Sequence, residues 1–405
     1  MKIIVLGGGA AGFFAAINIA LKNKHASVIL LEKARALLSK VRVSGGGRCN
    51  VTHACFDPKL LVTNYPRGNR ALLGPFYRFQ PKDTIEWFES RNVSLKEEED
   101  GRIFPVSNTS ETIISCLVTE AKNAGIKVLT EHAATLISKH QMGFNLYLQD
   151  ESLLTCDKLV VATGSNHKIY DLLESLGHTI VPPVPSLFTF TIEDPALHKL
   201  SGVTHANAHI KIKGTHLEQT GPLLITHWGF SGPAALKLSA WGARVLHEKN
   251  YAVELIVNWT YDFHEDVVKE KLLQCRNSFG NRTVINDTHF NIAKNLWKTL
   301  ILSCGLSEST TWSMLSNKEI YSIVEKLRRD TYKTNGKSTN KEEFVTAGGV
   351  CLDEVDFKTM QSKVCPGLYF AGEVLDIDGV TGGFNFQNAW TTAWITACSI
   401  GFLHN

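Results

Sequence analysis

The sequence predicts an α/β protein whose parallel-sheet domain is interrupted by a long insertion. Within the first 32 residues a short apolar strand is followed by a glycine turn, a helix and a second strand. Apolar strand-like segments recur at residues 157–164 and 367–372, and the character of the chain changes between them. At 405 residues the chain is long enough for two or three domains.

The first elements form a βαβ unit. Residues 3–6 are uniformly apolar, as in a strand buried on both faces of a parallel sheet. Residues 13–22 predict a helix, and residues 27–31 predict a second strand that ends at Glu32. The apolar start also resembles a signal peptide, but three consecutive glycines would break its helix. Strand, turn and helix are therefore the better interpretation, in the size range of a dinucleotide-binding fold.

The inserted segment has two parts. Alternation of apolar and polar residues at 209–213 and 252–257 predicts antiparallel strands. Farther along, helical spacing of apolar residues, as at 320–327, predicts helices, and the polar stretch 334–343 leads back to the sheet. The expected domains are a discontinuous Rossmann-like domain (1–186 and 344–405), an inserted antiparallel β domain (187–260 with about 330–343) and a small helical domain (261–329).

Composition and charge exclude several classes of protein. Hydrophobic residues make up 44% and charged residues 20%, which is typical of a globular protein. A net charge of +3 argues against a strongly basic nucleic-acid coat and leaves a local basic patch open. The nine cysteines include no C-x-x-C pair, which argues against a disulfide framework, a zinc site and a dithiol reductase. This distribution of cysteines favours a reducing cytoplasm, and no other stretch is long and apolar enough to span a membrane.

The sequence GGGAAG at residues 7–12 predicts a dinucleotide site. Its G-x-G-x-x-G spacing lets the backbone turn tightly and approach a pyrophosphate, whose charge would lie at the N-terminus of the next helix. Glu32, at the end of the following strand, is placed to accept hydrogen bonds from a ribose diol. The motif alone suits NAD as well as FAD.

A second glycine-rich loop lies in KVRVSGGGRCNVT at residues 40–52. Its residues 44–47 offer a row of backbone N–H donors between Arg42 and Arg48. Such a loop suits a phosphate or the polar edge of a flavin ring. An ordinary surface turn is the alternative.

Two more segments complete the predicted site. The sequence VATG at 161–164 ends one strand, and Glu373 follows another. A double glycine at 382–383 then precedes an apolar helix predicted to run to about residue 403. The N-terminus of this helix would stabilise the negative charge that a flavin gains on its N1/C2=O edge during reduction. A helix that merely packs on the core would explain neither the double glycine nor the polar cluster at 385–388.

These segments resemble the YhiN/BaiN-like bacterial flavoproteins, NAD(P)/FAD-dependent oxidoreductases that include aminoacetone oxidase. The resemblance covers essentially the whole chain and implies a two-part FAD domain with an inserted β-rich domain and a small helical domain. It selects FAD over NAD. Asn388 departs from the tryptophan that many relatives are expected to carry there. The most specific matching segments are SGGGRCN (44–50), THWGFSGP (226–233), VTAGGV (345–350) and GLYFAGEV (367–374).

Motifs and resemblance together predict an FAD site formed from both ends of the chain. Because the sequence contains one G-x-G-x-x-G, NAD(P)H is expected to bind transiently over the flavin. The expected cofactor contacts are Gly7, Gly9, Ala11, Gly12, Glu32, Lys33, Arg42, Ser44, Gly45, Gly46, Arg48, Asn50, Ala162, Thr163, Gly164, Gly372, Glu373, Gly383, Phe384, Asn385, Phe386 and Gln387.

Two residues are candidates for proton transfer to a substrate. Cys49 lies in the second glycine loop, and a thiol of pKa about 8.5 could protonate a carbanion left by hydride addition. The alternative is a buried cysteine that serves as a small apolar residue. His227 lies between a strand-like stretch and the turn GFSGP, where a substrate role and a structural hydrogen bond are both open.

The leading hypothesis is reduction of a conjugated C=C bond by flavin that NAD(P)H recharges. The resemblance implies a steroid-like enone or a uridine of ribosomal RNA, which would become dihydrouridine. A basic run at 326–329 with Lys333, Lys337 and Lys341 slightly favours RNA, although such runs are usually solvated faces. The alternatives are an oxygen-dependent oxidase of a small amine such as aminoacetone, and a binding protein in which FAD is structural.

Overall fold

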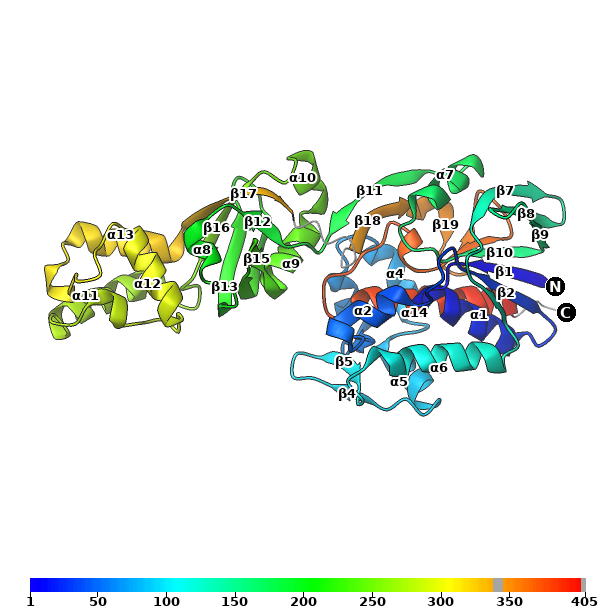
Figure 1. Cartoon of the computed structure of the whole chain (residues 1–405), viewed down its shortest axis with the longest axis horizontal. Helices are drawn as coiled ribbons and strands as arrows, with labels where there is room; N and C mark the ends of the chain where they lie inside the picture. Colours follow the sequence, from blue (N-terminus) through cyan, green and yellow to red (C-terminus); the bar gives the residue numbers. More distant parts are fainter. Residues whose placement is uncertain (338–344, 402–405) are drawn as a thin grey trace. The chain divides into compact units, whose positions relative to one another are not determined.

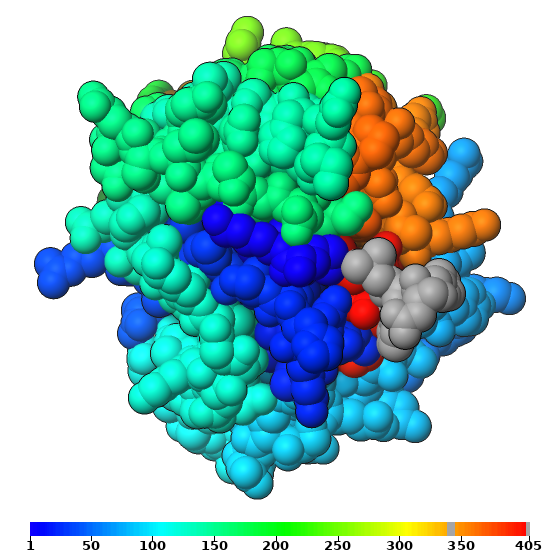
Figure 2. All heavy atoms as spheres, turned by 90° about the vertical axis from the view of Figure 1, so that its right-hand side faces the viewer, coloured from blue at the N-terminus to red at the C-terminus, as the bar shows by residue number. Residues whose placement is uncertain are grey.

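The chain divides into two compact units in the computed structural model, which describes residues 1–337 and 345–401 (Figure 1). The first unit contains Met1–Val184 and the segment from Val345 onward, and the second unit begins at Pro185. The first unit is thus formed by both ends of the chain. On one of its faces, segments far apart in the sequence meet, coloured blue, cyan-green and orange in Figure 2.

A seven-stranded sheet forms the centre of the first unit, in the order β19-β20-β21-β10-β1-β2-β6. The strands from β21 to β6 run parallel, whereas β19 and β20 pair antiparallel at one edge. This arrangement confirms the predicted α/β class and its Rossmann-like sheet. The strands are β1 (Lys2–Leu6), β2 (Ser27–Leu31), β6 (Lys127–Leu129), β10 (Lys158–Val161), β19 (Val355–Asp356), β20 (Gln361–Ser362) and β21 (Leu368–Phe370).

Helices and a smaller sheet cover the two faces of this central sheet. Figure 1 shows α1 (Ala10–Lys22), α6 (Ser110–Asn123) and α14 (Phe384–Gly401) on one side, and the sheet of β7, β8 and β9 on the other. The N-terminal helix α1 packs directly on the C-terminal helix α14. In their interface the buried Phe14 ring lies 5.2 Å from the Trp390 ring. The apolar pattern at both ends of the sequence therefore produces one shared core.

The remaining elements of the first unit surround this core. A three-stranded sheet β3-β5-β4 and the pair β11-β18 are the other sheets in the described residues. The bounds are α2 (Ser39–Gly47), β3 (Thr52–His53), α3 (Pro58–Leu61), α4 (Asn69–Phe76), α5 (Pro81–Glu89), β4 (Leu95–Glu97), β5 (Arg102–Pro105), β7 (Ala134–His140), β8 (Gly143–Leu148), β9 (Leu153–Cys156), α7 (His167–Ser175), β11 (Ile180–Ser186) and β18 (Val345–Val350).

A closed antiparallel barrel forms the first part of the second unit, which confirms the predicted antiparallel insertion. Its strand order is β12-β15-β14-β13-β16-β17. Along β13 the residues Ala208, Ile210 and Ile212 are buried while their neighbours are not, as the alternating sequence pattern predicts. The strands are β12 (Phe190–Ile192), β13 (Thr204–Ile212), β14 (Glu218–Ile225), β15 (Gly229–Ser231), β16 (Glu254–Asn258) and β17 (Asp330–Lys337).

Three longer helices follow the barrel strand β16 in the same unit. They share one continuous core with the barrel, in which Trp259 at the end of the barrel and Leu327 in α13 are both buried. The backbone N–H of Trp259 donates to the carbonyl of Leu327 at 2.8 Å. The helices of the second unit are α8 (Pro195–His198), α9 (Gly232–Trp241), α10 (Ala243–Glu248), α11 (Glu265–Ser278), α12 (Lys294–Ser303) and α13 (Asn317–Arg328).

Some sequence-based expectations fall on residues that the structure does not describe. These are the end of the polar return stretch up to residue 343, Lys341 in the basic run, and the end of the last helix near residue 403. Among the helices that are described, none is both long and apolar enough to cross a membrane.

Candidate functional site

The predicted cofactor motifs meet at the carboxyl end of the strands of the central sheet. Strands β21, β10, β1 and β2 are parallel neighbours, so the turns after their carboxyl ends lie side by side. Hydrogen bonds join these turns: the N–H groups of Gly7, Ala162 and Ala371 donate to Leu31, Leu6 and Val161, at 2.8, 2.8 and 3.1 Å. The sheet thereby brings together the GGGAAG turn, the VATG segment at 161–164 and the turn that contains Glu373.

The glycines of the first glycine turn have two different roles. A Cβ on Gly7, whose φ is +109°, would lie 2.4 Å from the carbonyl oxygen of Ala162, and one on Gly12 would lie 1.8 Å from that of Gly7. These two glycines allow strand, turn and helix to pack closely. A Cβ on Gly9 would meet no heavy atom of the described chain within 4 Å. Open space therefore lies where the pyrophosphate is expected, at the start of α1 beside Ala11.

Glu32 is held in place by backbone amides. Its Oε2 accepts from the N–H of Gly8 at 2.7 Å, and its Oε1 accepts from the N–H of Ala34 at 2.8 Å. Because each carboxylate oxygen can accept a second hydrogen bond, the group can still receive the hydroxyls of a ribose. Lys33, next to it, is exposed.

The second glycine loop leaves the helical conformation within α2. Ser44 has an extended ψ of 148°, and its hydroxyl donates to the carbonyl of Val41 at 2.8 Å. Gly45, Gly46 and Gly47 then follow with φ of +57°, +68° and +83°, a left-handed path that favours glycine. Around Gly46 and Gly47 an added Cβ would find no atom within 4 Å in the described chain. The loop therefore presents its backbone to open space.

Both arginines beside this loop have protein partners. Arg42 forms an ion pair with Glu111 of α6. Arg48 pairs with Glu98 at 2.6 Å and lies over the Phe104 ring, 4.0 Å from its centroid. The two guanidinium groups fasten the loop to its neighbours, so their predicted contact with the cofactor requires that they serve both roles.

Glu373 connects the second loop to the two strand ends. Its carboxylate forms an ion pair with Lys40 at 2.5 Å and accepts from the backbone N–H of Thr346 at 3.1 Å. A Cβ on Gly164, which ends the segment with Ala162 and Thr163, would lie 3.3 Å from Glu373 Oε2. Gly372, just before it, packs against Ala11 of α1.

The start of α14 is tied to the second loop through Asn50. In the orientation that satisfies both of its groups, the Asn50 amide donates to the carbonyl of Thr52 at 2.9 Å and accepts from the N–H of Gly383 at 3.0 Å. Gly383 has φ +93°, and a Cβ there would lie 2.5 Å from the carbonyl oxygen of Thr52. Phe384 stacks on the ring of His53, with centroids 4.7 Å apart.

The polar cluster on α14 divides into satisfied and unsatisfied members. Asn385 exchanges two hydrogen bonds of 2.8 Å with the backbone of Gly379. Gln387 accepts from the hydroxyls of Thr52 and Thr84 at 2.6 and 2.9 Å and donates to that of Thr391 at 3.0 Å. The side chains of Asn385 and Gln387 are thus used in hydrogen bonds within the protein. The ring of Phe386 stacks on that of Trp390.

Asn388 is the unsatisfied member. The residue is 2% exposed, and its Oδ1 has no hydrogen-bond partner within the described chain. A buried acceptor without a donor costs free energy that an incoming N–H or O–H group would recover. The open space at Gly9 and at Gly46 fits the binding of a long polar cofactor such as FAD. Asn388 stands where the resemblance implies tryptophan in many relatives, at the end of the turn from Gly383.

Tyr170 is a second residue with a buried polar atom that lacks a partner. It lies in α7, is 3% exposed, and its hydroxyl finds no partner among residues 1–337 and 345–401. Burial raises the pKa of this phenol, and the nearby carboxylates of Glu373 and Asp376 raise it further. A tyrosine in an amphipathic helix is usually a core residue, so the sequence held no signal for it.

The two predicted proton donors lie in different surroundings. Cys49 is fully buried, and burial raises the pKa of its thiol to about 12, an effect that a hydrogen bond with Ser44 only partly offsets. This placement matches the alternative of a small apolar residue. His227 is exposed in the turn between β14 and β15, next to Trp228, whose side chain is 62% exposed. His227 belongs to the second unit and Cys49 to the first.

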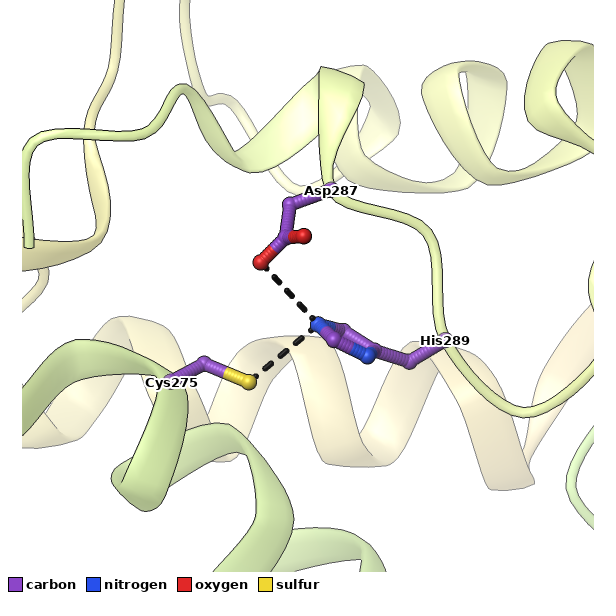
Figure 3. A group of neighbouring side chains, drawn as sticks. All are labelled: Cys275, Asp287 and His289. Carbon is purple, nitrogen blue, oxygen red and sulfur yellow. Dashed lines mark hydrogen bonds and ion pairs between the residues drawn. The ribbon is translucent and has the colours of Figure 1, made fainter. Parts of the chain in front are cut away.

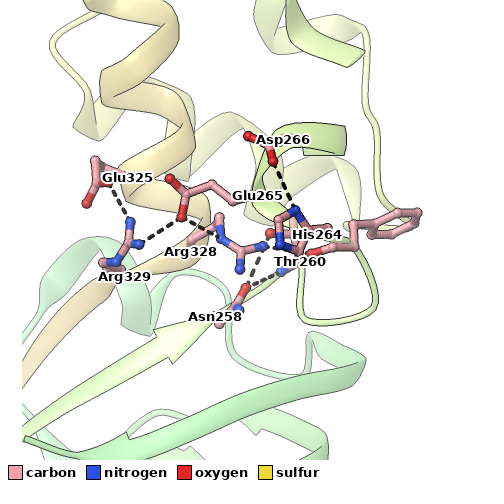
Figure 4. A network of polar contacts seen from close by, with 9 residues as sticks. Asn258, Thr260, His264, Glu265, Asp266, Glu325, Arg328 and Arg329 are labelled. Atoms are coloured by element: carbon pink, nitrogen blue, oxygen red, sulfur yellow. Dashed lines mark hydrogen bonds and ion pairs between the residues drawn. The ribbon is translucent and has the colours of Figure 1, made fainter. Parts of the chain in front are cut away.

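The basic run of the second unit is neutralised by neighbouring carboxylates (Figure 4). Arg329 pairs with Glu265 at 2.7 Å and with Glu325 at 2.5 Å, and Arg328 lies 3.4 Å from Glu265. Lys326 pairs with the buried Asp330 at 2.6 Å. Because these cations stabilise the unit internally, the run gives no support for RNA binding.

Comparison with protein families gives a match over nearly the entire chain. The model described as HI0933-like protein Rossmann domain matches residues 1–399. The ribosomal RNA dihydrouridine synthases of Escherichia coli (strain K12) and Haemophilus influenzae are each 28% identical to this chain. The alignments cover 97% of this chain and 96% of the first relative, and 98% of both chains for the second. A 3-dehydro-bile acid delta(4,6)-reductase of Clostridium scindens is 26% identical over 97% of both chains.

Two solved structures share the fold over almost their full length. A 3-ketosteroid-delta4-(5alpha)-dehydrogenase from Rhodococcus jostii superposes with a TM-score of 0.50 at 12% identity, covering 98% of this chain and 97% of that one. A 3-ketosteroid delta1-dehydrogenase from Sterolibacterium denitrificans gives 0.52 at 11% identity, covering 98% and 99%. At such identity the likeness concerns the fold alone.

Proposed function

Because this chain belongs to the HI0933-like family of FAD-binding Rossmann-domain proteins, a family of flavin oxidoreductases, we propose that it reduces a conjugated C=C bond and that its substrate is a uridine of ribosomal RNA. One observation carries the choice of substrate: two ribosomal RNA dihydrouridine synthases align with this chain along nearly their whole length. The basic residues at 326–329 are not part of the argument, because Lys326, Arg328 and Arg329 are paired with carboxylates.

The chemistry is common to both substrate classes that the relatives suggest. In uridine and in a dienone the C=C bond is conjugated with a carbonyl, so hydride addition at the far carbon places negative charge on the carbonyl oxygen. A proton then adds to the carbon next to the carbonyl. Bound FAD, reduced by NAD(P)H, would supply the hydride. The protein must therefore position the ring, stabilise developing charge and deliver one proton.

The residues at the sheet edge divide this work. The Gly7–Gly9 turn with the start of α1 would hold the diphosphate, and Glu32 would hold the ribose. The first amides of α14, fixed by the bond between Gly383 and Asn50, would stabilise negative charge on the ring. Of the two predicted proton donors, His227 is exposed and Cys49 is buried.

The substrate proposal is tested in ribosomal RNA. A strain that lacks the gene is expected to lose dihydrouridine from its ribosomal RNA, as measured by mass spectrometry of the nucleosides. Wild-type protein should restore the modification, and a G7A variant should not, because its Cβ would lie 2.4 Å from the carbonyl oxygen of Ala162. Unchanged dihydrouridine in the deletion strain would remove the RNA proposal.

A small enone is the second candidate substrate, and the bile acid reductase of Clostridium scindens supports it. Under argon, reduced protein should be oxidised by its true acceptor and not by the other, so parallel additions of RNA and of a steroid dienone separate the two.

The other two hypotheses, an amine oxidase and a binding protein with structural FAD, are tested by the behaviour of the flavin. Rapid reoxidation in air with release of peroxide would favour an amine oxidase. A flavin that neither NADPH nor dithionite bleaches would favour a structural cofactor.

A further inference from the structure

Three potential metal ligands converge in the helical part of the second unit (Figure 3). Cys275 lies in the last turns of α11, Asp287 directly follows the short helix η2 (Val284–Asn286), and His289 lies in the segment before α12. One ligand atom of each lies within 4.8 Å of the other two. The cluster is remote in sequence from every motif of the predicted FAD site.

The three side chains meet at a single ring nitrogen. His289 Nε2 lies 3.2 Å from Cys275 Sγ and 3.3 Å from Asp287 Oδ2. In a nucleophile–histidine–carboxylate relay the thiol and the carboxylate contact different ring nitrogens. Here both contact the same one, so the cluster does not have the geometry of a relay. It is a group of three potential ligand atoms that lie close together.

One hydrogen at Nε2 cannot join all three groups. If Nε2 carries a proton and donates it to Asp287 Oδ2, the thiol receives no hydrogen bond from the ring. If Nε2 is unprotonated, it accepts a hydrogen bond from the thiol. Its lone pair is then repelled by the lone pairs of the nearby Asp287 carboxylate. A divalent cation bound by imidazole nitrogen, thiolate and carboxylate would satisfy all three groups at once.

Two of the three distances between ligand atoms are close to those around a tetrahedral ion, and the third, from sulfur to the carboxylate, is within 4.8 Å. Zinc lies about 2.3 Å from sulfur and about 2.0–2.2 Å from nitrogen and oxygen, so neighbouring ligand atoms are about 3.3–3.6 Å apart. The two observed separations of 3.2 and 3.3 Å are within a few tenths of an ångström of that range. The mixed sulfur, nitrogen and oxygen set favours zinc over magnesium or calcium, which prefer oxygen ligands.

Surrounding residues orient the carboxylate and shield the cluster. The indole N–H of Trp312 donates to Asp287 Oδ2 at 3.0 Å, and Arg282 donates to Oδ1 at 3.3 Å. The Cys275 side chain is fully buried. The rings of Trp297 and Trp312 lie 5.8 and 5.9 Å from the His289 ring. Such supporting hydrogen bonds are typical of metal sites.

We propose that Cys275, Asp287 and His289 bind one Zn²⁺, with water as the fourth ligand, and that this ion fastens α11 to the segment before α12. The proposal is independent of the flavin chemistry. The absence of C-x-x-C pairs argues against zinc sites with paired cysteines, and this site uses a single cysteine.

The test is metal binding by the full-length protein. After treatment with a chelator, the chain is expected to bind one equivalent of Zn²⁺, and C275S should bind it more than about tenfold more weakly. C304S is the matched control: Cys304 also lies in the helical part, and its thiol donates to Leu300 O at 3.4 Å. C304S should bind Zn²⁺ like wild type. Retained FAD absorbance in each variant shows that the first unit is folded.

A second measurement detects the bond between the thiolate and the metal directly. With Co²⁺ in place of Zn²⁺, the wild-type protein should show a thiolate-to-cobalt charge-transfer band that is kept in C304S and lost in C275S. A cobalt complex without that band, or equal Zn²⁺ affinity in wild type and C275S, would overturn the proposal. Bound Zn²⁺ should also raise the melting temperature, because it binds only the folded cluster.

Discussion

Lys40 and Glu373 are 333 residues apart in the sequence and form an ion pair of 2.5 Å. The pair joins α2, which carries the second glycine loop, to the turn after β21. Lys40 is 57% exposed and Glu373 20% exposed, so the attraction is largely screened by solvent. Its value is therefore positional, since it fixes where Glu373 lies beside Gly164.

K40M should separate the positional role from the stabilising one. An exposed ion pair contributes at most about 1 kcal/mol, so the free energy of unfolding should change little. FAD should nevertheless dissociate more readily, because Glu373 loses one of its two anchors. Urea unfolding and FAD titration measure the two effects. K24M, at an exposed lysine of the first unit, is the control, and equal loss of FAD in both variants would refute the positional role.

Gly9 and Gly12 should respond oppositely to alanine. A Cβ on Gly12 would lie 1.8 Å from the carbonyl oxygen of Gly7, so G12A should destabilise the first unit by about 1–3 kcal/mol or prevent its folding. G9A meets open space and has an ordinary φ of −92°, so it should fold normally and bind FAD much more weakly. Thermal melting and FAD content distinguish the two. A G9A protein with full FAD content would contradict the proposed position of the diphosphate.

Asn388 and Gln387, adjacent in α14, should also differ. N388L removes a buried acceptor without a partner, so the protein without FAD should keep or gain stability. Q387L removes three hydrogen bonds, which should cost about 1–3 kcal/mol because Thr52 and Thr84 lose their acceptor. Denaturant unfolding of the protein freed of FAD checks both. A loss of stability in N388L as large as that in Q387L would contradict the unpaired state of Oδ1.

Because of Cys49, the free energy of unfolding should fall as the pH becomes alkaline. Its thiol has a pKa of about 12 when folded, above the ordinary value of 9.0, so the folded state favours the neutral thiol. This contribution is complete below pH 9.0 and is lost between pH 9.0 and about 12, as the unfolded thiol ionises first. Wild type should lose about 2 kcal/mol more than C49A between about pH 8 and 10.5. Equal losses in urea unfolding would contradict the burial, and full turnover by C49A would leave His227 as the remaining predicted donor.

Local sequence patterns predicted where helices and strands lie better than they predicted which strands pair with each other. Ser27–Leu31 is a strand with the predicted bounds, because a strand buried on both faces needs an uninterrupted apolar run. The closure of the barrel by β12 and β17 depends on pairing residues about 140 positions apart, as between Thr191 and Gly336. Such a register is not encoded in any short window.

The same limit applies to the site. Glycine spacing identified both loops, because the need for positive φ and close approach is a local property of the backbone. The ion pairs of Arg42 with Glu111 and of Arg48 with Glu98 depend on tertiary packing, so the sequence could present these arginines only as unpaired charges. The unpaired Oδ1 of Asn388 is visible only once its neighbours are known.

The packing of α14 on α1 has a consequence for biosynthesis. The ribosome makes α1 more than 350 residues before it completes α14, so the first unit lacks one of its packed helices for most of that synthesis. The second unit is continuous in sequence, so it can fold while the first unit still lacks β21 and α14. If FAD binds at the predicted residues, its capture must wait for α14, and a chain that stops before residue 384 is expected to bind it weakly.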